Sequence, residues 1–154
     1  MATTIDFSNR KIDVDVVTRM TIAANKNTAN SYFERLLNQG DISVADAIFA
    51  SGIRFHYPLG ILTGVDDVKQ YIETFRTAFP DIHFTVAAFI GEGDKVSARW
   101  SLAGTQTGIF KGQAPTGKKV KIPGITIFEI LNGKIAEMWI AFDPALLTGD
   151  QRNG

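Results

Sequence analysis

Four segments in the second half of the chain have the length and composition of β-strands, and they constrain the fold more than any other feature. They span residues 82–90, 96–106, 120–131 and 134–143. Turn or loop residues, mainly glycine, separate these segments. The last two segments are joined by Asn132-Gly133, a dipeptide typical of a two-residue hairpin turn. The sequence therefore predicts a meander of four long antiparallel strands.

The first half of the chain shows the helical spacing of apolar residues. Between residues 25 and 39 apolar side chains recur at steps of three and four, and residues 64–79 repeat this pattern most clearly. A shorter helix is expected after Ser43, because Asp46 follows three residues later in an arrangement like a capping box. One strand, over residues 53–57, lies between these helices.

Helices that precede a run of strands predict an α+β domain, with the N-terminal helices packed over the concave face of a cone-shaped, curved antiparallel sheet. A conical cavity is then expected between helices and sheet. The chain has 154 residues, which suits one domain. We place that domain at residues 25–150 and expect the polar residues 1–24 to form an extension. A bulge or bend is expected at Pro123-Gly124, where proline interrupts a strand.

Composition narrows the possible functions. Lys and Arg together number 16, as do Asp and Glu, so the net charge is zero, which argues against nucleic acid or an anionic membrane as partner. Cysteine is absent and only two histidines occur, so neither a disulfide framework nor a metal cluster is expected. No signal-peptide layout and no apolar run of about 20 residues is found, so we expect a cytoplasmic protein. Dinucleotide, Walker, zinc-protease and serine-hydrolase motifs are missing, which leaves binding, or acid/base chemistry without a cofactor.

The last strand carries the main candidate for chemistry. Alternation places one set of residues on a shared face: Ile135, Glu137, Trp139, Ala141 and Asp143. Both faces are largely apolar, so we expect one to line the cavity and the other to meet a partner subunit or more core. Apolar surroundings would raise the pKa of the Asp143 carboxyl toward the range of general acid/base catalysis. The alternative is that Asp143 caps the turn that begins at Pro144.

His56, Trp100 and Gln106 are further candidates. His56 lies between aromatic residues, where a neutral imidazole could act as a base; alternatively it is a hydrogen-bonded residue of the core or rim. Trp100 shares a strand face with apolar residues and is expected in the core or the pocket wall. Gln106 follows on that face and, if buried, needs either backbone groups or a ligand oxygen as hydrogen-bond partners.

Several short motifs follow one another in the second half of the chain. They are Asp81-Ile82-His83-Phe84-Thr85, Gly93-Asp94-Lys95-Val96, Trp100, Gly104-Thr105-Gln106-Thr107-Gly108, Gly112, Pro115-Thr116-Gly117, and Gly133-Lys134-Ile135 with Glu137, Trp139 and Asp143. In this order and spacing they resemble the SnoaL-like polyketide cyclase family. The resemblance runs from about residue 25 to residue 147.

The resemblance implies the nuclear-transport-factor-2-like fold and, frequently, a homodimer built through the sheets. It also implies an intramolecular aldol step without metal or cofactor, in which Asp143 is the general acid/base and His56 enters the pocket. Many family members have His at the position of Gln106. Glutamine can hold a ligand oxygen but cannot exchange a proton near neutral pH. The same fold hosts other enzymes and non-catalytic binding domains.

The sequence thus predicts a cofactor-independent cyclase or isomerase acting on a hydrophobic, polyketide- or terpenoid-like molecule. Asp143 would move the proton. The remaining expected site residues orient oxygens or form the apolar wall: His56, Tyr57 and Gln106, and Trp100, Phe128 and Trp139. The alternative is a non-catalytic, ligand-binding dimer of the same fold.

Overall fold

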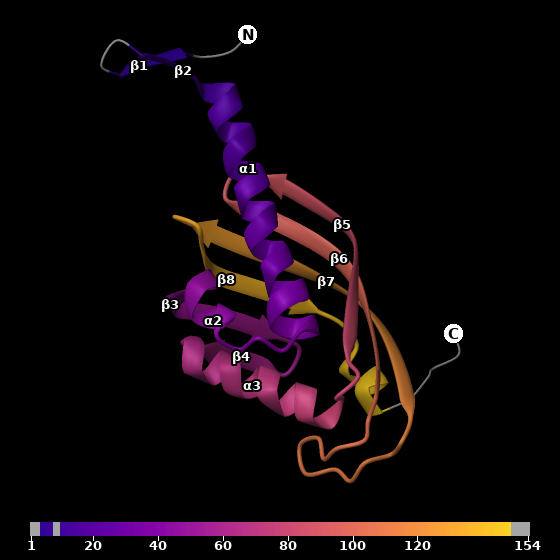
Figure 1. Ribbon diagram of the computed structural model, residues 1–154. Helices are drawn as coiled ribbons and strands as arrows, with labels where there is room; N and C mark the ends of the chain where they lie inside the picture. Colours follow the sequence, from indigo (N-terminus) through magenta and orange to yellow (C-terminus); the bar gives the residue numbers. More distant parts are fainter. Residues whose placement is uncertain (1–3, 8–9, 149–154) are drawn as a thin grey trace.

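The computed structural model describes residues 4–7 and 10–148 (Figure 1). In chain order the elements are β1 (Thr4–Phe7), β2 (Arg10–Asp13), α1 (Val14–Ser31), the π-helix η1 (Tyr32–Asn38), α2 (Val44–Ile48), β3 (Phe49–Tyr57), β4 (Gly60–Thr63), α3 (Val65–Ala78), β5 (His83–Glu92), β6 (Lys95–Thr105), β7 (Lys119–Leu131), β8 (Lys134–Ala141) and the 3-10 helix η2 (Pro144–Thr148). The predicted α+β class is confirmed.

Six strands form one curved, open sheet in the order β4-β3-β8-β7-β6-β5, and β1 pairs with β2 separately. Strands β5 to β8 form the predicted antiparallel meander. However, β3 pairs in parallel with β8, so the sheet is mixed and the prediction of a purely antiparallel sheet is wrong. The turn signals that predicted the meander act between neighbours in sequence. They carry no information about β3 and β8, which are far apart along the chain.

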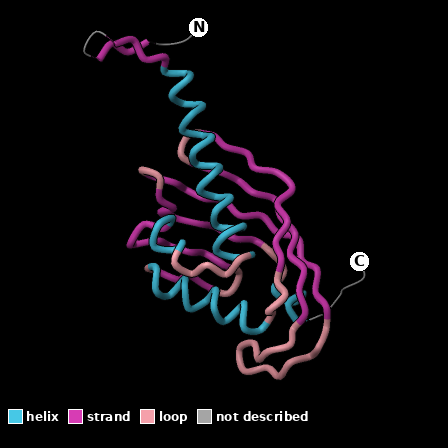
Figure 2. Tube along the Cα trace, viewed as in Figure 1, coloured by secondary structure: helices cyan, strands magenta, loops and turns pink. Residues whose placement is uncertain are grey.

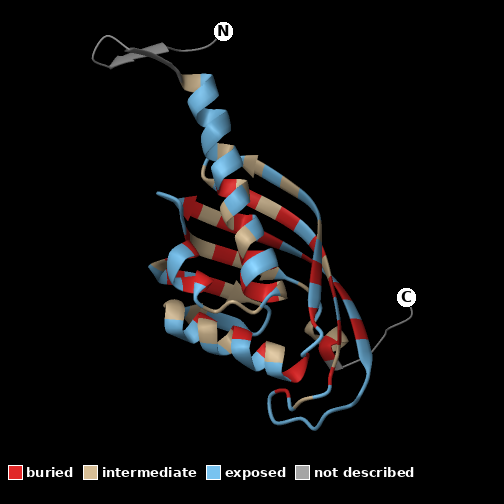
Figure 3. Ribbon diagram, viewed as in Figure 1, coloured by how far each residue is buried: buried red, intermediate tan, exposed pale blue. Residues whose placement is uncertain are grey.

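The helices cover one face of the six-stranded sheet, which we call the inner face; the opposite face is the outer face (Figure 2). Every second residue of β6 and β7 is buried, as expected for a sheet with one covered face. The N-terminal part of α1, which falls in the predicted extension 1–24, projects beyond the sheet and is exposed (Figure 3). The core therefore lies between the inner face and the helices.

Helical spacing located the helices but not all of their ends. The stretch predicted as a helix over residues 25–39 belongs to a longer run, α1 followed by η1, that begins at Val14. Helix α3 agrees with the prediction over residues 64–79. The predicted capping box at Ser43 is wrong, because its hydroxyl donates to the Asp41 carboxylate at 2.5 Å and makes no bond to the helix backbone.

Two expectations concern strand β7: a hairpin turn after its last residue and a bulge or bend within it. Only the turn is confirmed. Asn132 and Gly133 have positive φ values of 52° and 76°, which confirms the predicted hairpin turn. Of the bulge or bend expected at Pro123-Gly124, the bulge is wrong, since β7 pairs with β6 through these residues without a register shift. Gly124 has a different role: a Cβ atom there would lie 2.2 Å from the Trp100 indole. The glycine makes room for that ring.

The bulge lies instead in β8, at Ala136. Ile130 pairs with Ile135 while the adjacent Glu129 pairs with Glu137, so β8 contains one extra residue. Because of this extra residue, the side chains before and after Ala136 that would share a face in a regular strand point to opposite faces of the sheet. Ile135 is buried in the core, and the prediction that it shares a face with Glu137 is wrong. Strand pairing sets this shift, and period-two alternation alone could not reveal it.

Candidate functional site

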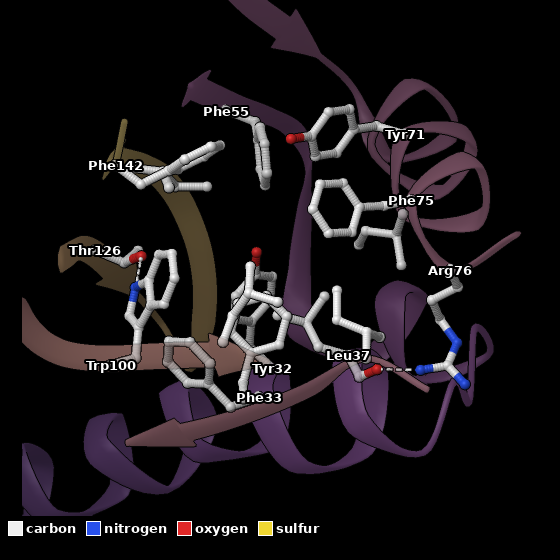
Figure 4. A pocket seen from close by; sticks show the side chains of 15 residues that line it. Tyr32, Phe33, Leu37, Phe55, Tyr71, Phe75, Arg76, Trp100, Thr126 and Phe142 are labelled. Carbon is white, nitrogen blue, oxygen red and sulfur yellow. Dashed lines mark hydrogen bonds between the residues drawn. The ribbon is translucent and has the colours of Figure 1, made fainter. Parts of the chain in front are cut away.

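The helices and the inner face enclose a cavity of about 40 Å³, enough for about three water molecules. Its lining comes from η1, α3, β3 and the four strands of the meander (Figure 4). Five phenylalanine rings form much of the wall: Phe33, Phe55, Phe75, Phe84 and Phe142. No Asp, Glu or His occurs among the described residues that line it. The polar groups are the hydroxyls of two tyrosines and a threonine, one indole N–H and one guanidinium.

Tyr32 directs its hydroxyl into the cavity from the start of η1 (Figure 4). A π-helix closes i→i+5 hydrogen bonds, so Tyr32 and Leu37 lie on the same side of η1 and both line the cavity. The Tyr32 ring packs edge-on against Phe33 and Phe128, with centroid distances of 5.1 and 5.5 Å. The described residues offer its hydroxyl no hydrogen-bond partner. Burial, and then the nearby Tyr71, raise the pKa of Tyr32 far above its usual value, so the phenol stays neutral.

Tyr71 directs a second hydroxyl into the cavity from the middle of α3 (Figure 4). Its ring lies between Tyr57 and Phe55, with centroid distances of 5.0 and 5.5 Å. Its hydroxyl also has no hydrogen-bond partner within the described part of the chain. Burial, followed by the influence of Tyr57, raises the pKa of Tyr71 well above its usual value. Two neutral phenol donors therefore face one apolar space.

Thr126 and Trp100 form a buried pair on the inner face. The indole Nε1–H of Trp100 donates to Thr126 Oγ1 at 2.9 Å, and both residues line the cavity (Figure 4). The Trp100 ring also packs against Phe84 at a centroid distance of 5.2 Å. The expected position of Trp100 in the pocket wall agrees with this placement.

Arg76 lies at one end of the cavity, and its guanidinium is used to hold the helices together. Nη1 donates to the backbone oxygens of Leu37 and Asn38, the latter at 3.3 Å. The Asn38 side chain in turn exchanges two hydrogen bonds with the backbone of Phe84, at 2.9 and 2.7 Å. The end of η1 is thereby fixed to both α3 and β5, which secures the position of Tyr32.

Asp143, the predicted acid/base, is exposed and follows the cavity residue Phe142 directly. Its Oδ1 accepts a hydrogen bond from the backbone N–H of Ala145 at 3.0 Å, and its carbonyl oxygen accepts one from Leu146 at 3.2 Å. This is the capping arrangement that the sequence left open as the alternative. A catalytic role for Asp143 stays a prediction.

Gln106 is buried, and its side chain contacts the loop that follows β6 rather than the cavity. Its amide nitrogen donates to the backbone oxygens of Gly108 and Ala114, each at 3.3 Å. Its Oε1 accepts the hydroxyl hydrogen of Thr116 at 3.1 Å. These partners correspond to the backbone alternative, so Gln106 closes the loop between β6 and β7.

Two of the remaining predicted residues, His56 and Trp139, lie on the outer face. The imidazole of His56 stacks on the Trp139 indole at a centroid distance of 5.6 Å and an interplanar angle of 7°. His56 Nε2 lies 2.6 Å from Glu137 Oε2. We call these three residues the outer cluster. None of them lines the cavity.

Phe128 and Tyr57 lie near the cavity without lining it. Phe128 is fully buried beneath the rings of Tyr32 and Phe33. Tyr57 is half-buried and packs behind Tyr71. Both support the two tyrosines whose hydroxyls reach the cavity.

The sequence pattern missed the three hydroxyls. Tyr32 and Tyr71 occupy helical positions at which an aromatic ring is expected to pack in the core, so nothing marked their hydroxyls as unpaired. The signal for Thr126 was available, because it is a polar residue at an alternating position between Gly124 and Phe128 on an otherwise apolar strand face. A polar group there must find a partner or face a ligand.

Two observations concern the part of the chain that the structure describes. No helix there is long and apolar enough to cross a membrane. Within the same residues, no three side chains of His, Cys, Asp or Glu come together in a way that could hold a metal ion.

Comparison with known proteins gives the family. Residues 27–149 match the SnoaL-like polyketide cyclase family. The chain belongs to this family. No curated protein matches the chain. The family assignment agrees with the resemblance carried by the motifs of the second half of the chain.

Solved structures share the SnoaL-like fold. A protein of Jannaschia sp. CCS1, proposed to be a SnoaL-like polyketide cyclase, is 25% identical, with a TM-score of 0.76 over 83% of this chain and 91% of its own. AclR of Streptomyces galilaeus, proposed to be a hydroxylase, is 23% identical, with a TM-score of 0.73 over 83% and 95%. IdmH of Streptomyces antibioticus, proposed to be a polyketide cyclase, is 21% identical, with a TM-score of 0.70 over 81% and 96%.

Proposed function

We propose that this SnoaL-like protein is a cofactor-independent cyclase or isomerase that binds an apolar, carbonyl-bearing small molecule in the cavity. The observation that carries the proposal is the pair of hydroxyls, on Tyr32 and Tyr71, that face an apolar space and have no hydrogen-bond partner among the described residues. An unpaired donor in such a place is costly unless a ligand or water accepts its hydrogen. A carbonyl oxygen is an acceptor of the required kind.

The two phenols would act on the charge that develops at the carbonyl oxygen. When a base removes a proton from the carbon next to the carbonyl, the C–H electron pair moves toward oxygen and an enolate forms. Neutral donors aimed at that oxygen stabilise the enolate more than the ground state, which lowers the barrier. The enolate carbon can then attack a second carbonyl and close a ring, after which the new alkoxide takes up a proton.

Asp143 remains the proposed base. It directly follows Phe142, the last residue of the cavity wall on this part of the chain. To reach a bound ligand its carboxylate must leave the N–H of Ala145. The cost of that exchange is small, because a single hydrogen bond in an exposed cap contributes about 1 kcal/mol.

A ligand of drug size needs more room than the cavity offers. Typical small-molecule pockets measure roughly 300–1,000 Å³, against about 40 Å³ here. Tyr71 and Phe142 are only partly buried wall residues, so they can move with less loss of packing than the fully buried ones. We therefore propose that binding displaces the Phe142 ring, while the Tyr71 ring shifts only as far as its hydroxyl can follow the ligand oxygen.

The second candidate function is binding without turnover. It is favoured by one observation: no carboxylate or imidazole occurs among the described residues of the cavity wall. The two functions differ in what happens to a bound ketone. A binding protein would hold the ketone unchanged, whereas an enzyme of the proposed kind would speed its enolisation.

The test uses 2-tetralone, a small bicyclic ketone, and tetralin, which has the same skeleton without the carbonyl. Binding of both is measured by titration calorimetry, and enolisation by NMR as exchange of the α-hydrogens for deuterium in D₂O. We expect tighter binding of 2-tetralone and an exchange rate that the protein increases. Asp143→Asn should remove the rate increase while 2-tetralone still binds. Binding with no rate increase in the natural chain would favour the second function, and no binding of either compound would contradict both.

A further inference from the structure

In the hydrogen bond between Trp100 and Thr126, the donor and the acceptor follow from the two side-chain types. An indole N–H can donate but cannot accept, so Thr126 Oγ1 must be the acceptor in the 2.9 Å contact. The hydroxyl hydrogen of Thr126 is therefore not used in this bond. Because a hydroxyl carries one donor and two acceptor sites, the hydrogen remains available to another partner.

No described residue takes up that hydrogen. The contact with Trp100 is the only side-chain hydrogen bond of Thr126 in the described part of the chain. Thr126 is 1% exposed, so bulk water does not reach it freely. It lines the cavity, and the cavity is where an acceptor can be placed.

The indole that sets this direction is held in place. Gly124, which pairs with Trp100 across β6 and β7, leaves the space that the ring fills, since a Cβ there would approach it to 2.2 Å. Phe84 packs against another part of the indole, at a centroid distance of 5.2 Å. With the indole fixed, one of the two acceptor sites on Thr126 is filled and its hydrogen points elsewhere.

We propose that Thr126 is a third ligand donor and determines specificity for molecules with two acceptor oxygens. Thr126 comes from the sheet and Tyr71 from the helix layer on the opposite wall, with the Tyr32 hydroxyl between them (Figure 4). The cavity then offers three O–H donors and, among its described lining, no carboxylate acceptor. These donors suit a ligand with two carbonyl oxygens, such as a dicarbonyl or quinone. This inference rests on the proposed function, since it concerns the same cavity.

A purely structural role for Thr126 is the alternative, because the hydroxyl also satisfies the buried indole N–H. The two roles predict different results for ligands that differ in their number of acceptors. Loss of a structural group would weaken the binding of all ligands to the same extent. Loss of a ligand donor would weaken only the ligand whose second oxygen it holds.

The test compares dissociation constants for 1,4-naphthoquinone, with two carbonyls, and 2-tetralone, with one. The chain has no cysteine that could react with the quinone. We expect the natural protein to prefer the quinone. Thr126→Val keeps the shape but not the hydroxyl, and should reduce this preference about five- to tenfold. Thr126→Ser keeps the hydroxyl and should retain the preference.

If Thr126→Val does not fold, the double substitution Trp100→Phe with Thr126→Val is used. It removes the donor and the acceptor together, so no buried polar group is left without a partner, and the protein loses less stability. The same loss of preference is expected. Equal weakening of both compounds, or a natural protein without preference for the quinone, would overturn the role of Thr126 while the proposed function stands. A natural protein that binds neither compound would overturn both.

Discussion

The inner and outer faces of the same sheet use polar side chains in opposite ways. On the inner side, the hydroxyls of Tyr32 and Tyr71 have no partner among the described residues and face a cavity. On the outer face, His56 and Glu137 are paired with each other at 2.6 Å, and the imidazole is stacked on an indole. Unpaired donors in an enclosed space suit a ligand, whereas a paired and stacked cluster is already satisfied. The inner face is therefore where we expect chemistry.

The outer face carries exposed apolar side chains that could contact another protein chain. Strand pairing aligns one row of residues across all six strands: Ile61, His56, Trp139, Ile127, Ser97 and Ile90. The three isoleucines are 54%, 40% and 69% exposed. The three exposed isoleucines and the half-buried Trp139 give this face the apolar surface that a protein–protein contact uses. It supports the proposal, first suggested by the family resemblance, that a second copy of the chain packs on this face.

The largest expected difference between the faces is in stability. Phe128 is fully buried beneath Tyr32, and Phe128→Ala should lower the free energy of unfolding by about 3–5 kcal/mol. The adjacent Ile127 points outward and is 40% exposed, so Ile127→Ala should cost about 1 kcal/mol or less. Urea unfolding below the concentration at which the chain self-associates measures both. Equal losses would mean that the two faces are not buried as described.

The two inner tyrosines should make stability depend on alkaline pH. Burial raises the pKa of both above the usual value of about 10. The unfolded chain then loses phenol protons first, so the stability held below pH 10 is lost as the pH rises further. Each tyrosine should contribute a loss of about 1.4 kcal/mol per pH unit.

The matched variants are Tyr32→Phe and Tyr71→Phe, which remove the titrating hydroxyl and keep the ring. Urea unfolding between pH 9 and pH 11 should show a shallower decline for each variant than for the natural chain. A decline of the same slope in the natural chain and in the variant with both substitutions would mean that these phenols titrate normally in the folded state.

The smallest effect concerns association through the outer face. Ile127→Lys places a charge in the centre of the apolar row, and it should weaken a dimer about tenfold or more without unfolding the subunit. Met20→Lys is the control, because Met20 is 66% exposed and lies on α1, which belongs to the helices and not to the outer face. Sedimentation equilibrium measures both. A natural chain that sediments as a monomer would exclude the proposed partner.

Local signals in the sequence predicted most of the fold. The stripe of apolar residues in α3 and the Asn132-Gly133 turn are determined by neighbours in the chain, and the structure agrees with both. The parallel pairing of β3 with β8 and the bulge at Ala136 depend on residues far apart in sequence, so no local pattern contained them.

The candidate site was harder to predict than the fold. Trp100 was placed in the pocket wall because its strand alternates regularly. Strand alternation with Asp143 predicts Trp139 in the site, and the family resemblance predicts His56 there, but their side of the sheet depends on the strand register. Tyr32 and Tyr71 were missed because a tyrosine on an apolar helix face resembles any other core residue until the space around its hydroxyl is known.

The central claim is that the inner hydroxyls, and not the outer cluster, act on the ligand. The most direct measurement is the rate at which the protein exchanges the α-hydrogens of 2-tetralone for deuterium. Replacing both Tyr32 and Tyr71 by Phe should lower that rate roughly 100-fold or more, as expected when oxyanion donors are lost. His56→Gln should leave the rate nearly unchanged, because no residue of the outer cluster lines the cavity. A rate that survives the loss of both tyrosines but falls with His56→Gln would contradict the account.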